Sequence, residues 1–360
     1  MSKNWRIFAV VAVALAGVSA NLFVALANSG SWSADFNQYY AAGKLVGTGH
    51  LYDWDAVQNL ERPHGGNRTP FIRMPVFAAA FKPLTALPYD TARVVWFGLS
   101  LAVWAAFPFL WPLKRRTWVW AAMAWCTPAA MCLAFGQDSM FFLFFVALGL
   151  RLLMGNHDFA AGLVLSLCAS KPHLAIALPV LLVARRNWRA LAGAMTGGAF
   201  LLLVSAAVEG VGWPARYLAL TSLPDFDPGL DRMPNLRGLL HWVHLGMGVE
   251  IPVALAALGA MYFLCRRLPL ATGAALALAV GLWTGHHGYS YDCLLLVPAL
   301  LFGLEEPLPA PLREWAMLLL TPVPYLLLLT DSPWMGIVVV AGYTPALLCG
   351  LVYREHAATG

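Results

Sequence analysis

Long apolar runs recur along the whole chain and limit what it can fold into. The 360-residue sequence is 60% hydrophobic and only 11% charged, whereas soluble domains carry about 25% charged residues. A soluble fold needs a polar surface, which this composition cannot supply. A bilayer removes that need, and a helix of roughly 20 apolar residues spans it. The composition therefore predicts an all-α polytopic membrane protein.

The apolar runs predict about twelve membrane crossings in a single domain, 1–360. The expected helices are 7–27, 89–113, 117–135, 139–154, 158–169, 172–184, 190–208, 250–265, 269–285, 291–304, 314–330 and 335–353. Several are short, and short or interrupted helices in membranes usually border a polar cavity. Segment 71–87 is apolar but contains two prolines, Arg73 and Lys82. We interpret it as re-entrant or lying on the surface of the outer side.

The first run has two interpretations. Lys3 and Arg6 precede it, and Ala25-Leu26-Ala27 is similar to a signal-peptidase site. The run 7–27 is long for the apolar part of a signal peptide, so we interpret it as an uncleaved first helix.

Basic residues lie in short links between the runs, as in Lys114-Arg115-Arg116, Arg185-Arg186 and Arg266-Arg267. The positive-inside rule places these links and both termini in the cytoplasm. The outer side then receives two large loops, 28–88 and 209–249. We expect a multi-pass protein of a bacterial cytoplasmic (inner) membrane with its site on the periplasmic side. No basic face indicates nucleic acid, and the six cysteines show neither metal spacing nor a paired-loop pattern.

Five polar clusters converge on the predicted outer side, and the first contains Asp35, Tyr39 and Tyr40. A carboxylate at the membrane edge is a candidate general base, because burial raises its pKa toward a useful value. The alternative is a helix N-cap formed by Ser33 or Asp35. In a second cluster, Gln137-Asp138, the aspartate either caps the next helix or takes part directly.

Cations occur in two further clusters. Lys171 and His173 lie at a break between short helices, where a charge is costly unless it is paired or faces water. A phosphate is a suitable partner, and a lysine that snorkels to the interface is the alternative. Arg237, beside Gly238, is a plausible phosphate ligand in the second outer loop. His241 and His244 downstream are a weak metal signal, and 224–228 is typical of a turn.

The last cluster, 286–292, contains His286, His287, Tyr289 and Asp292. It suits a sugar, a phosphate or a metal, although adjacent histidines do not easily bind one ion. A polar loop without a chemical role is the alternative.

The order of these motifs resembles glycosyltransferase family 87 over nearly the whole chain. The motifs are Asp35-Phe36, Tyr39-Tyr40-Ala41-Ala42, Leu51-Tyr52-Asp53, the Pro-bearing segment 70–88, Gly136-Gln137, Lys171-Pro172-His173, Arg185-Arg186-Asn187-Trp188-Arg189, Asn235-Leu236-Arg237-Gly238 and Tyr289-Ser290-Tyr291-Asp292. The resemblance implies a GT-C type fold with amphipathic helices in the first outer loop. It also implies a mannosyltransferase that uses polyprenyl-phosphate mannose, with Asp35 in the place of the family's base. The family often has Tyr-Pro-Pro where this chain has Arg73-Met74-Pro75, and this departure leaves the acceptor open.

The hypothesis from the sequence is therefore an inverting transfer of a sugar, mannose by resemblance, from a polyprenyl-phosphate donor. Asp35 is the predicted base. The predicted phosphate ligands are Lys171, His173, Arg237 and Arg73, and the predicted sugar or acceptor ligands are Tyr39, Tyr40, Gln137, Asp138, His286, His287, Tyr289 and Asp292. No cofactor is expected, since fixed cations can replace a metal. The acceptor is left open among a glycolipid, a polysaccharide and a protein. A transporter or flippase is the alternative, although it predicts internal repeats that the sequence lacks; an inactive scaffold is a third.

Overall fold

The computed structural model describes residues 3–27, 34–65, 70–113, 116–222, 229–306 and 308–357. Throughout these ranges the regular structure is helical, and no strand occurs in them. The prediction of an all-α protein is thus confirmed.

Four helices of the described ranges are long and apolar enough to cross a membrane. They are α5 (Tyr89–Leu110), α12 (Trp188–Glu209), α15 (Met247–Cys265) and α20 (Trp334–Ala357). Shorter apolar helices add to the bundle, among them α1 (Lys3–Ala27), α8 (Ser139–Met154) and α16 (Leu270–Thr284). These helices give the chain its transmembrane character, while the count of about twelve crossings stays a prediction.

Several expected helices are divided in two. The run 117–135 forms α6 (Arg116–Trp125) and α7 (Thr127–Phe135), with Cys126 extended between them. Pro128 explains this break, because proline has no N–H for the helix and clashes with the preceding turn. The other divided runs form α9 (Asp158–Ser166) with η4 (Leu167–Ser170), α10 (Pro172–Ala175) with α11 (Ala177–Ala184), η6 (Asp292–Leu296) with α17 (Val297–Glu305), and α18 (Ala310–Leu319) with α19 (Val323–Leu327).

The ambiguous segment 71–87 forms a short helix, α4 (Pro75–Phe81), followed by the 3-10 turn η3 (Lys82–Ala86). A helix of this length rises only about 10 Å, whereas the hydrocarbon core of a bilayer is about 30 Å thick. Helix α4 is therefore too short to span a bilayer by itself, and the re-entrant or surface position of the segment stays a prediction.

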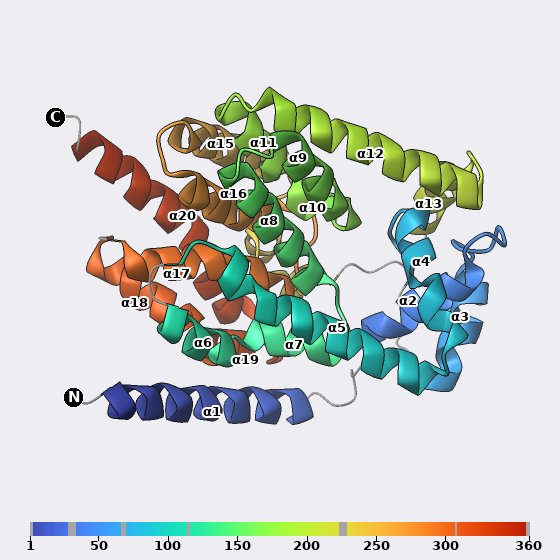
Figure 1. The fold of residues 1–360 in the computed structure, drawn as a ribbon, viewed down its shortest axis with the longest axis horizontal. Helices are drawn as coiled ribbons and strands as arrows, with labels where there is room; N and C mark the ends of the chain where they lie inside the picture. Colours follow the sequence, from blue (N-terminus) through green and yellow to red (C-terminus); the bar gives the residue numbers. More distant parts are fainter. Residues whose placement is uncertain are drawn as a thin grey trace.

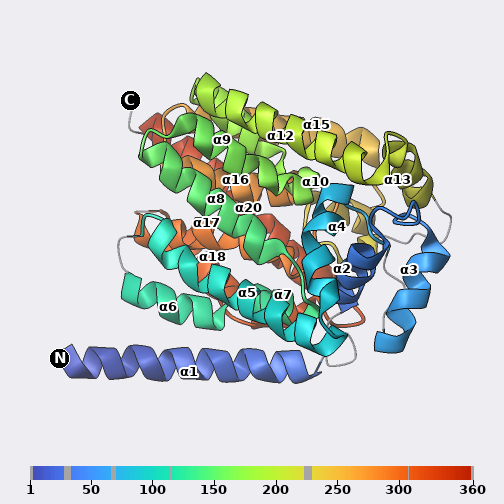
Figure 2. The same ribbon diagram turned by 45° about the vertical axis from the view of Figure 1, so that its right-hand side comes forward.

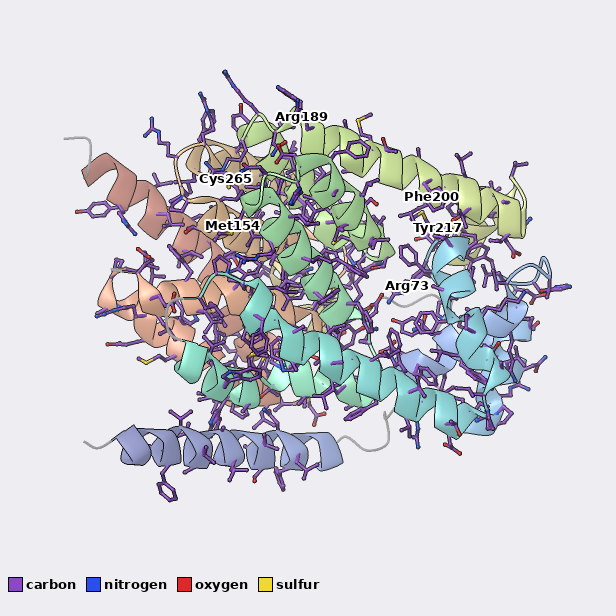
Figure 3. All side chains as sticks on the ribbon, in the orientation of Figure 1. Arg73, Met154, Arg189, Phe200, Tyr217 and Cys265 are labelled. Atoms are coloured by element: carbon purple, nitrogen blue, oxygen red, sulfur yellow. The ribbon has the colours of Figure 1, made fainter. Side chains whose placement is uncertain are left out.

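The non-spanning helices gather at one end of the bundle, which we call the loop end. There α2 (Ala34–Leu45), α3 (Trp54–Glu61), α4 and α13 (Trp213–Thr221) lie together, while the N- and C-termini lie at the opposite end (Figure 1). The turned view shows the same separation (Figure 2). Arg73 and Tyr217 lie at the loop end, and Met154 and Cys265 lie toward the termini (Figure 3). The start of α1 and the end of α20 thus lie at the same end of the bundle (Figure 1); the prediction that both termini are cytoplasmic stays a prediction.

Helix α1 lies along the flank of the bundle (Figure 1). It packs on α6 and α7, and Trp125 Nε1 donates a hydrogen bond to its Val13 carbonyl at 2.8 Å. Asn21 Nδ2 donates to the Ala124 carbonyl at 2.8 Å, and Asn21 Oδ1 accepts from Thr127 Oγ1 at 2.8 Å. These bonds satisfy a polar side chain that would otherwise be costly in an apolar wall.

Candidate functional site

Helix α2 is a polar helix that the loop end buries on all sides. Its residues from Asp35 to Gly43 are buried, and it packs on α3, α4, η3 and α7. Buried polar groups are costly unless they are hydrogen-bonded, so the hydrogen-bond partners of the α2 side chains identify the residues that form a polar site with this helix.

Asp35 is 8% exposed, and its Oδ1 accepts a hydrogen bond from Gln38 Nε2 at 3.0 Å. Its carboxylate also bonds to the side chain of Gln137. Asp35 lies inside α2 and its side chain takes these partners, which disfavours the interpretation as an N-cap. Ser33, the other candidate cap, lies outside the described residues.

Tyr39 lies one helical turn after Asp35. It connects α2 to Arg73 and to residues 136–138, which form the α7–α8 link. The Tyr39 hydroxyl donates to Gln137 Oε1 at 3.0 Å and accepts from the Arg73 guanidinium. Arg73 also contacts Asp138 Oδ1 at 3.0 Å and donates to the Ser170 carbonyl at 3.2 Å. The Asp138 side chain makes no capping bond to α8, so its carboxylate belongs to the site rather than to a helix cap.

Lys171 extends this arrangement to the other half of the chain. Its Nζ donates to Asp292 Oδ1 at 2.5 Å and to Ser139 Oγ at 2.7 Å, and it lies 3.4 Å from Asp138 Oδ1. Ser139 Oγ in turn donates to Asp292 Oδ1 at 2.7 Å. We call the connected set the carboxylate–cation network; it consists of Asp35, Gln38, Tyr39, Arg73, Gln137, Asp138, Ser139, Lys171 and Asp292.

The charges of the network do not balance, since two cations face three carboxylates. Arg73 pairs with Asp138, and Lys171 pairs with Asp292 and Asp138. Asp35 is the carboxylate that no ion pair of the described residues includes. Burial raises the pKa of Asp35 to about 6, while the hydrogen bond from Gln137 and the positive charges of Lys171 and Arg73 oppose the rise. Such a group exchanges a proton near neutral pH, as a general base must.

Gly136 sets the distance between α2 and the α7–α8 link. It ends α7 in the left-handed conformation with φ 74°, which favours glycine. A Cβ at this position would lie 2.7 Å from Phe36 Cβ. Because Gly136 has no side chain, the backbone of α2 can approach closely enough for Asp35 to reach Gln137.

A second group of cationic and imidazole side chains comes from separate loops. Arg237 hydrogen-bonds the His286 ring, the His286 and His287 ring centroids are 4.7 Å apart, and those of His287 and His173 are 5.8 Å apart. We call Arg237, His286, His287 and His173 the histidine–arginine cluster. Burial lowers the pKa of His287 to about 4, so this ring is neutral at pH 7.

Asn235 connects the two loops of this cluster. Its Oδ1 accepts from Gly238 N at 3.0 Å at the start of α14 (Leu236–Trp242). Its Nδ2 donates to the Gly285 carbonyl at 2.8 Å. One fully buried side chain thereby fixes both the helix that presents Arg237 and the loop that presents His286.

Two of the predicted residues contribute differently from the rest. The Tyr40 hydroxyl donates to the Leu87 carbonyl at 2.8 Å, and its ring packs on Tyr89, so it faces away from the network. Tyr289 contributes its backbone N–H, which donates to Asp292 Oδ2 at 3.1 Å. Across the described part of the chain, no three His, Cys, Asp or Glu side chains are arranged to hold a metal ion, and His241 and His244 are exposed.

Sequence reasoning missed Ser139, Gln38 and Tyr291. Lys171 Nζ lies 5.2 Å from the centroid of the Tyr291 ring, a cation–π contact. Ser139 directly follows the predicted pair Gln137-Asp138, and this adjacency was the available signal. Gln38 lies three residues after Asp35, on the same face of the helix.

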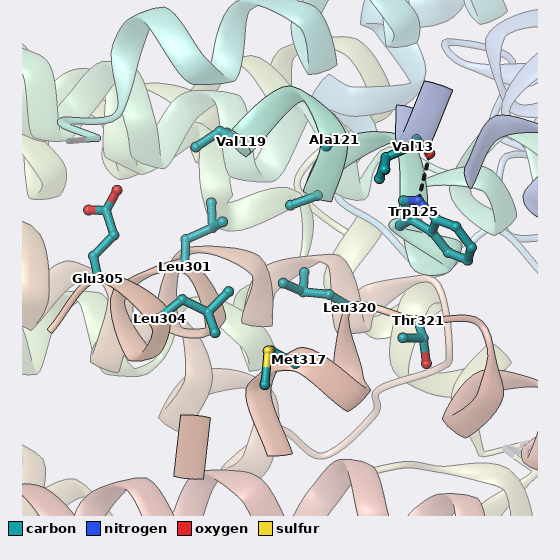
Figure 4. A pocket seen from close by; sticks show the side chains of 11 residues that line it. Val13, Val119, Ala121, Trp125, Leu301, Leu304, Glu305, Met317, Leu320 and Thr321 are labelled. Carbon is teal, nitrogen blue, oxygen red and sulfur yellow. Dashed lines mark hydrogen bonds between the residues drawn. The ribbon is translucent and has the colours of Figure 1, made fainter. Parts of the chain in front are cut away.

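Among the cavities of the described residues, two bear on the position of the site. One, of about 450 Å³, lies between α1, α6, α17 and α18, and its lining includes Val13, Trp125 and Glu305 (Figure 4). No network residue lines it. The other, of about 610 Å³, has Phe36 and Gly136 in its lining, the direct neighbours of Asp35 and Gln137.

Comparison with known proteins agrees with the motif order. The model of glycosyltransferase family 87 matches residues 71–298, well over half of the chain. No curated protein and no solved structure matches it significantly. The matched region contains Arg73, the α7–α8 link, Lys171, Arg237 and the 286–292 cluster, which form the carboxylate–cation network and the histidine–arginine cluster. The chain belongs to glycosyltransferase family 87 and is a membrane glycosyltransferase.

Proposed function

We propose that the protein transfers mannose from polyprenyl-phosphate mannose to an acceptor hydroxyl at the outer face of the cytoplasmic membrane, and that it inverts the anomeric centre. The observation that carries this proposal is Asp35, a buried carboxylate without an ion pair among the described residues. The charges of two paired cations, Lys171 and Arg73, act on it, and the histidine–arginine cluster begins beyond Lys171 with His173. An acceptor hydroxyl needs a base, and a departing lipid phosphate needs fixed positive charge.

The donor fits this arrangement for a topological reason. Soluble nucleotide sugars are not available on the outer side, so glycosyl transfer there needs a donor that is already in the membrane. Arg186 lies in the link before α12, Arg189 lies in the first turn of α12, and Arg266 and Arg267 follow α15. Arg189 lies at the end of α12 that is away from the loop end (Figure 3). The positive-inside rule places such links in the cytoplasm, and the loop end then faces outward.

The transfer is a single displacement. The acceptor oxygen attacks the anomeric carbon while Asp35 removes the hydroxyl proton. The bond from that carbon to the phosphate oxygen breaks, and its electron pair leaves with the polyprenyl phosphate. In the histidine–arginine cluster, Arg237 and His173 are partly exposed and contact the leaving phosphate. Arg73 and Lys171 lie deeper in the protein than these two residues. Their positive charges stabilise the negative charge that develops on the leaving phosphate, in a site of low dielectric constant.

The remaining network residues orient the sugar and the acceptor. Tyr39, Gln137 and Asp138 converge on Arg73, and Arg73 Nε is a buried donor that has no hydrogen-bond partner among the described residues. An unpaired buried donor costs free energy, and a substrate hydroxyl or phosphate oxygen would satisfy it. His286, His287, Tyr289 and Asp292 complete the opposite wall.

The test uses purified protein in nanodiscs with polyprenyl-phosphate [14C]mannose and a membrane glycolipid extract. We expect radioactive mannose to appear in a new lipid or polymer product, and polyprenyl phosphate to be released in equal amount. GDP-[14C]mannose, as the matched control donor, should give no product. Movement of intact donor across the bilayer without cleavage would instead support a flippase and refute the proposal.

A further inference from the structure

We propose that Arg216 and Tyr217, neighbours on α13, form a second saccharide site that binds a sugar unit of the acceptor away from the hydroxyl that reacts. This inference rests on the proposed function, and it adds a site that lies outside both the carboxylate–cation network and the histidine–arginine cluster. Helix α13 belongs to the loop end, where Tyr217 and Arg73 both lie (Figure 3).

The site is built on two buried aromatic rings. Tyr52 and Trp213 are 6% and 9% exposed, and their ring centroids are 6.5 Å apart at an interplanar angle of 26°. Tyr217 stands edge-on to both, at 5.8 Å from Tyr52 and 6.5 Å from Trp213. Tyr52 and Trp213 thereby pack α13 on the first outer loop and fix the direction of Tyr217.

Tyr217 itself stays partly exposed, and its hydroxyl makes no hydrogen bond to a described residue. A tyrosine offers an apolar ring and a polar tip. A pyranose has the matching character, because one face carries C–H groups and the edges carry hydroxyls. The exposed ring is therefore suited to stack on a sugar.

Arg216 lies beside this ring and is held by the end of α12. Its Nη2 donates to the Glu209 carbonyl at 2.5 Å. Glu209 is fixed in turn, since its Oε2 accepts from Gly47 N at 2.8 Å. The Arg216 side chain is nevertheless 39% exposed, and a guanidinium has five N–H donors. Arg216 is thus positioned by Glu209 and keeps donors for a ligand.

The geometry of this pair does not fit a purely structural role. Glu209 Oε1 lies 3.6 Å from Arg216 Nη2, which is too long for a hydrogen bond. Within the described residues, both Glu209 Oε1 and Arg216 Nε are buried without a hydrogen-bond partner. Such atoms are costly and call for an explanation. A sugar hydroxyl both donates and accepts, and the opposite charges of the pair favour a neutral polyol over an anion.

Arg73 connects this site to the carboxylate–cation network. Its carbonyl accepts from the Tyr52 hydroxyl at 2.7 Å, while its guanidinium reaches Tyr39. Burial raises the pKa of the Tyr217 hydroxyl, and the positive charge of Arg73 opposes the rise, so the two side chains are within electrostatic reach. A saccharide chain that starts at Asp35 and passes Arg73 therefore arrives at Tyr217.

The length of α2 separates the two ends of this path. The helix rises about 15 Å from Asp35 to Leu45, and Glu209 binds Gly47 two residues farther on. One hexose is too small to reach from Asp35 to the residues that Glu209 positions. A monosaccharide acceptor thus occupies the reaction centre alone, whereas an oligosaccharide also contacts Arg216 and Tyr217.

The first experiment measures binding without turnover. Radiolabelled α-mannotriose and methyl α-mannoside are dialysed to equilibrium against the protein in nanodiscs, without donor. We expect the trisaccharide to bind at least about tenfold more tightly. Arg216→Gln should weaken its binding about tenfold or more, and Tyr217→Ala about threefold to tenfold. Tyr217→Phe keeps the ring and should retain most of the affinity.

Leu218 provides the matched control, because it lies on the same helix and is 61% exposed. Leu218→Ala should bind both sugars like the wild type. Equal affinity of the wild type for the two sugars overturns the second saccharide site. So does a trisaccharide affinity that neither Arg216→Gln nor Tyr217→Ala changes, when both variants have a wild-type Tm.

The second experiment compares the two sugars as acceptors of [14C]mannose from the polyprenyl-phosphate donor. The ratio of kcat/KM for α-mannotriose to that for methyl α-mannoside should fall toward one in Tyr217→Ala and stay near the wild-type value in Tyr217→Phe. A loss of activity by the same factor with both acceptors leaves the ratio unchanged, which would assign Tyr217 to packing and overturn the inference.

The two measurements also separate the inference from the proposed function. Absence of donor cleavage with either acceptor refutes the proposed glycosyl transfer. Binding of α-mannotriose that depends on Tyr217 would then still establish a saccharide site on α13, whereas transfer without such binding would leave the enzyme activity and remove the site.

Discussion

Lys171 Nζ lies 2.5 Å from Asp292 Oδ1, and the two side chains are 4% and 3% exposed. A charge buried to this extent is tolerated because its partner and further hydrogen bonds compensate for the lost hydration. Ser139 and Asp138 supply those further contacts. Lys171 therefore joins the two halves of the site, and in the proposed mechanism it acts on the phosphate mainly through its charge.

Replacement of Lys171 by methionine should destabilise the protein by about 3–5 kcal/mol, because Asp292 is left buried without its partner. Thermal unfolding in detergent measures this as a lower Tm. Lys171→Met combined with Asp292→Asn should lose much less than the sum of the two single changes. The exposed Lys82 provides the control, and Lys82→Met should unfold like the wild type. A normal Tm for Lys171→Met would mean that the pair contributes nothing to stability.

Asp35→Asn keeps the shape of the side chain and removes the base. We expect a fall in kcat of about 100-fold or more, with an unchanged Tm. Asp55 on α3 is exposed, and Asp55→Asn should retain full activity in the same donor-cleavage assay. Full turnover by Asp35→Asn would remove Asp35 from the mechanism.

The pH dependence of kcat/KM should report the ionisation of Asp35. Burial raises its pKa to about 6, and the ionised form is the active base. Activity should therefore rise with pH through about 6 and be about tenfold lower at pH 5 than on the plateau. Since the Gln137 hydrogen bond lowers this pKa, Gln137→Leu should move the midpoint to higher pH. A profile that is flat from pH 5 to pH 8 contradicts the assignment.

Gly136→Ala tests whether the close approach of α2 matters. The added Cβ would lie 2.7 Å from Phe36 Cβ, and alanine in the left-handed region costs about 1–2 kcal/mol. We expect lower activity because Asp35 and Gln137 are forced apart. Gly98→Ala is the matched control: no atom lies within 4 Å of the added Cβ, and alanine favours the helix. Equal activity of both variants would show that the approach is not needed.

The sequence predicts the membrane class and many helix positions because hydropathy over long runs is a strong signal. The expected helix 139–154 matches α8 (Ser139–Met154). The breaks at Cys126 and near Thr321 were missed although Pro128, Pro322 and Pro324 stand in those runs. Proline inside an apolar run often ends a helix, but Pro108 and Pro345 lie within α5 and α20 and do not end them.

The sequence analysis grouped the site residues by the side of the membrane on which each was expected. Such a grouping does not show which of these side chains contact each other. Tyr39 and Tyr40 were both expected on the outer side of the membrane, but they lie on different faces of helix α2. Tyr39 lies one turn after Asp35 and shares its face, whereas the Tyr40 side chain points away from that face. The pairing of Lys171 with Asp292, 121 residues apart, has no such local signal and requires the fold.

Arg237 offers the most direct test of the phosphate site. It is partly buried, bonds to His286, and begins a helix that Asn235 caps. A charge-assisted hydrogen bond contributes about 1.5–3 kcal/mol, so Arg237→Gln should lower kcat/KM for the donor by roughly 10- to 100-fold. The inhibition constant of polyprenyl phosphate should rise in parallel, because the product carries the same phosphate. Arg232, an exposed residue paired with Asp231 at 3.7 Å, provides the control, and Arg232→Gln should change neither quantity. If Arg237→Gln lowers activity but leaves inhibition by polyprenyl phosphate unchanged, Arg237 contacts the sugar or the acceptor and the phosphate lies closer to Lys171.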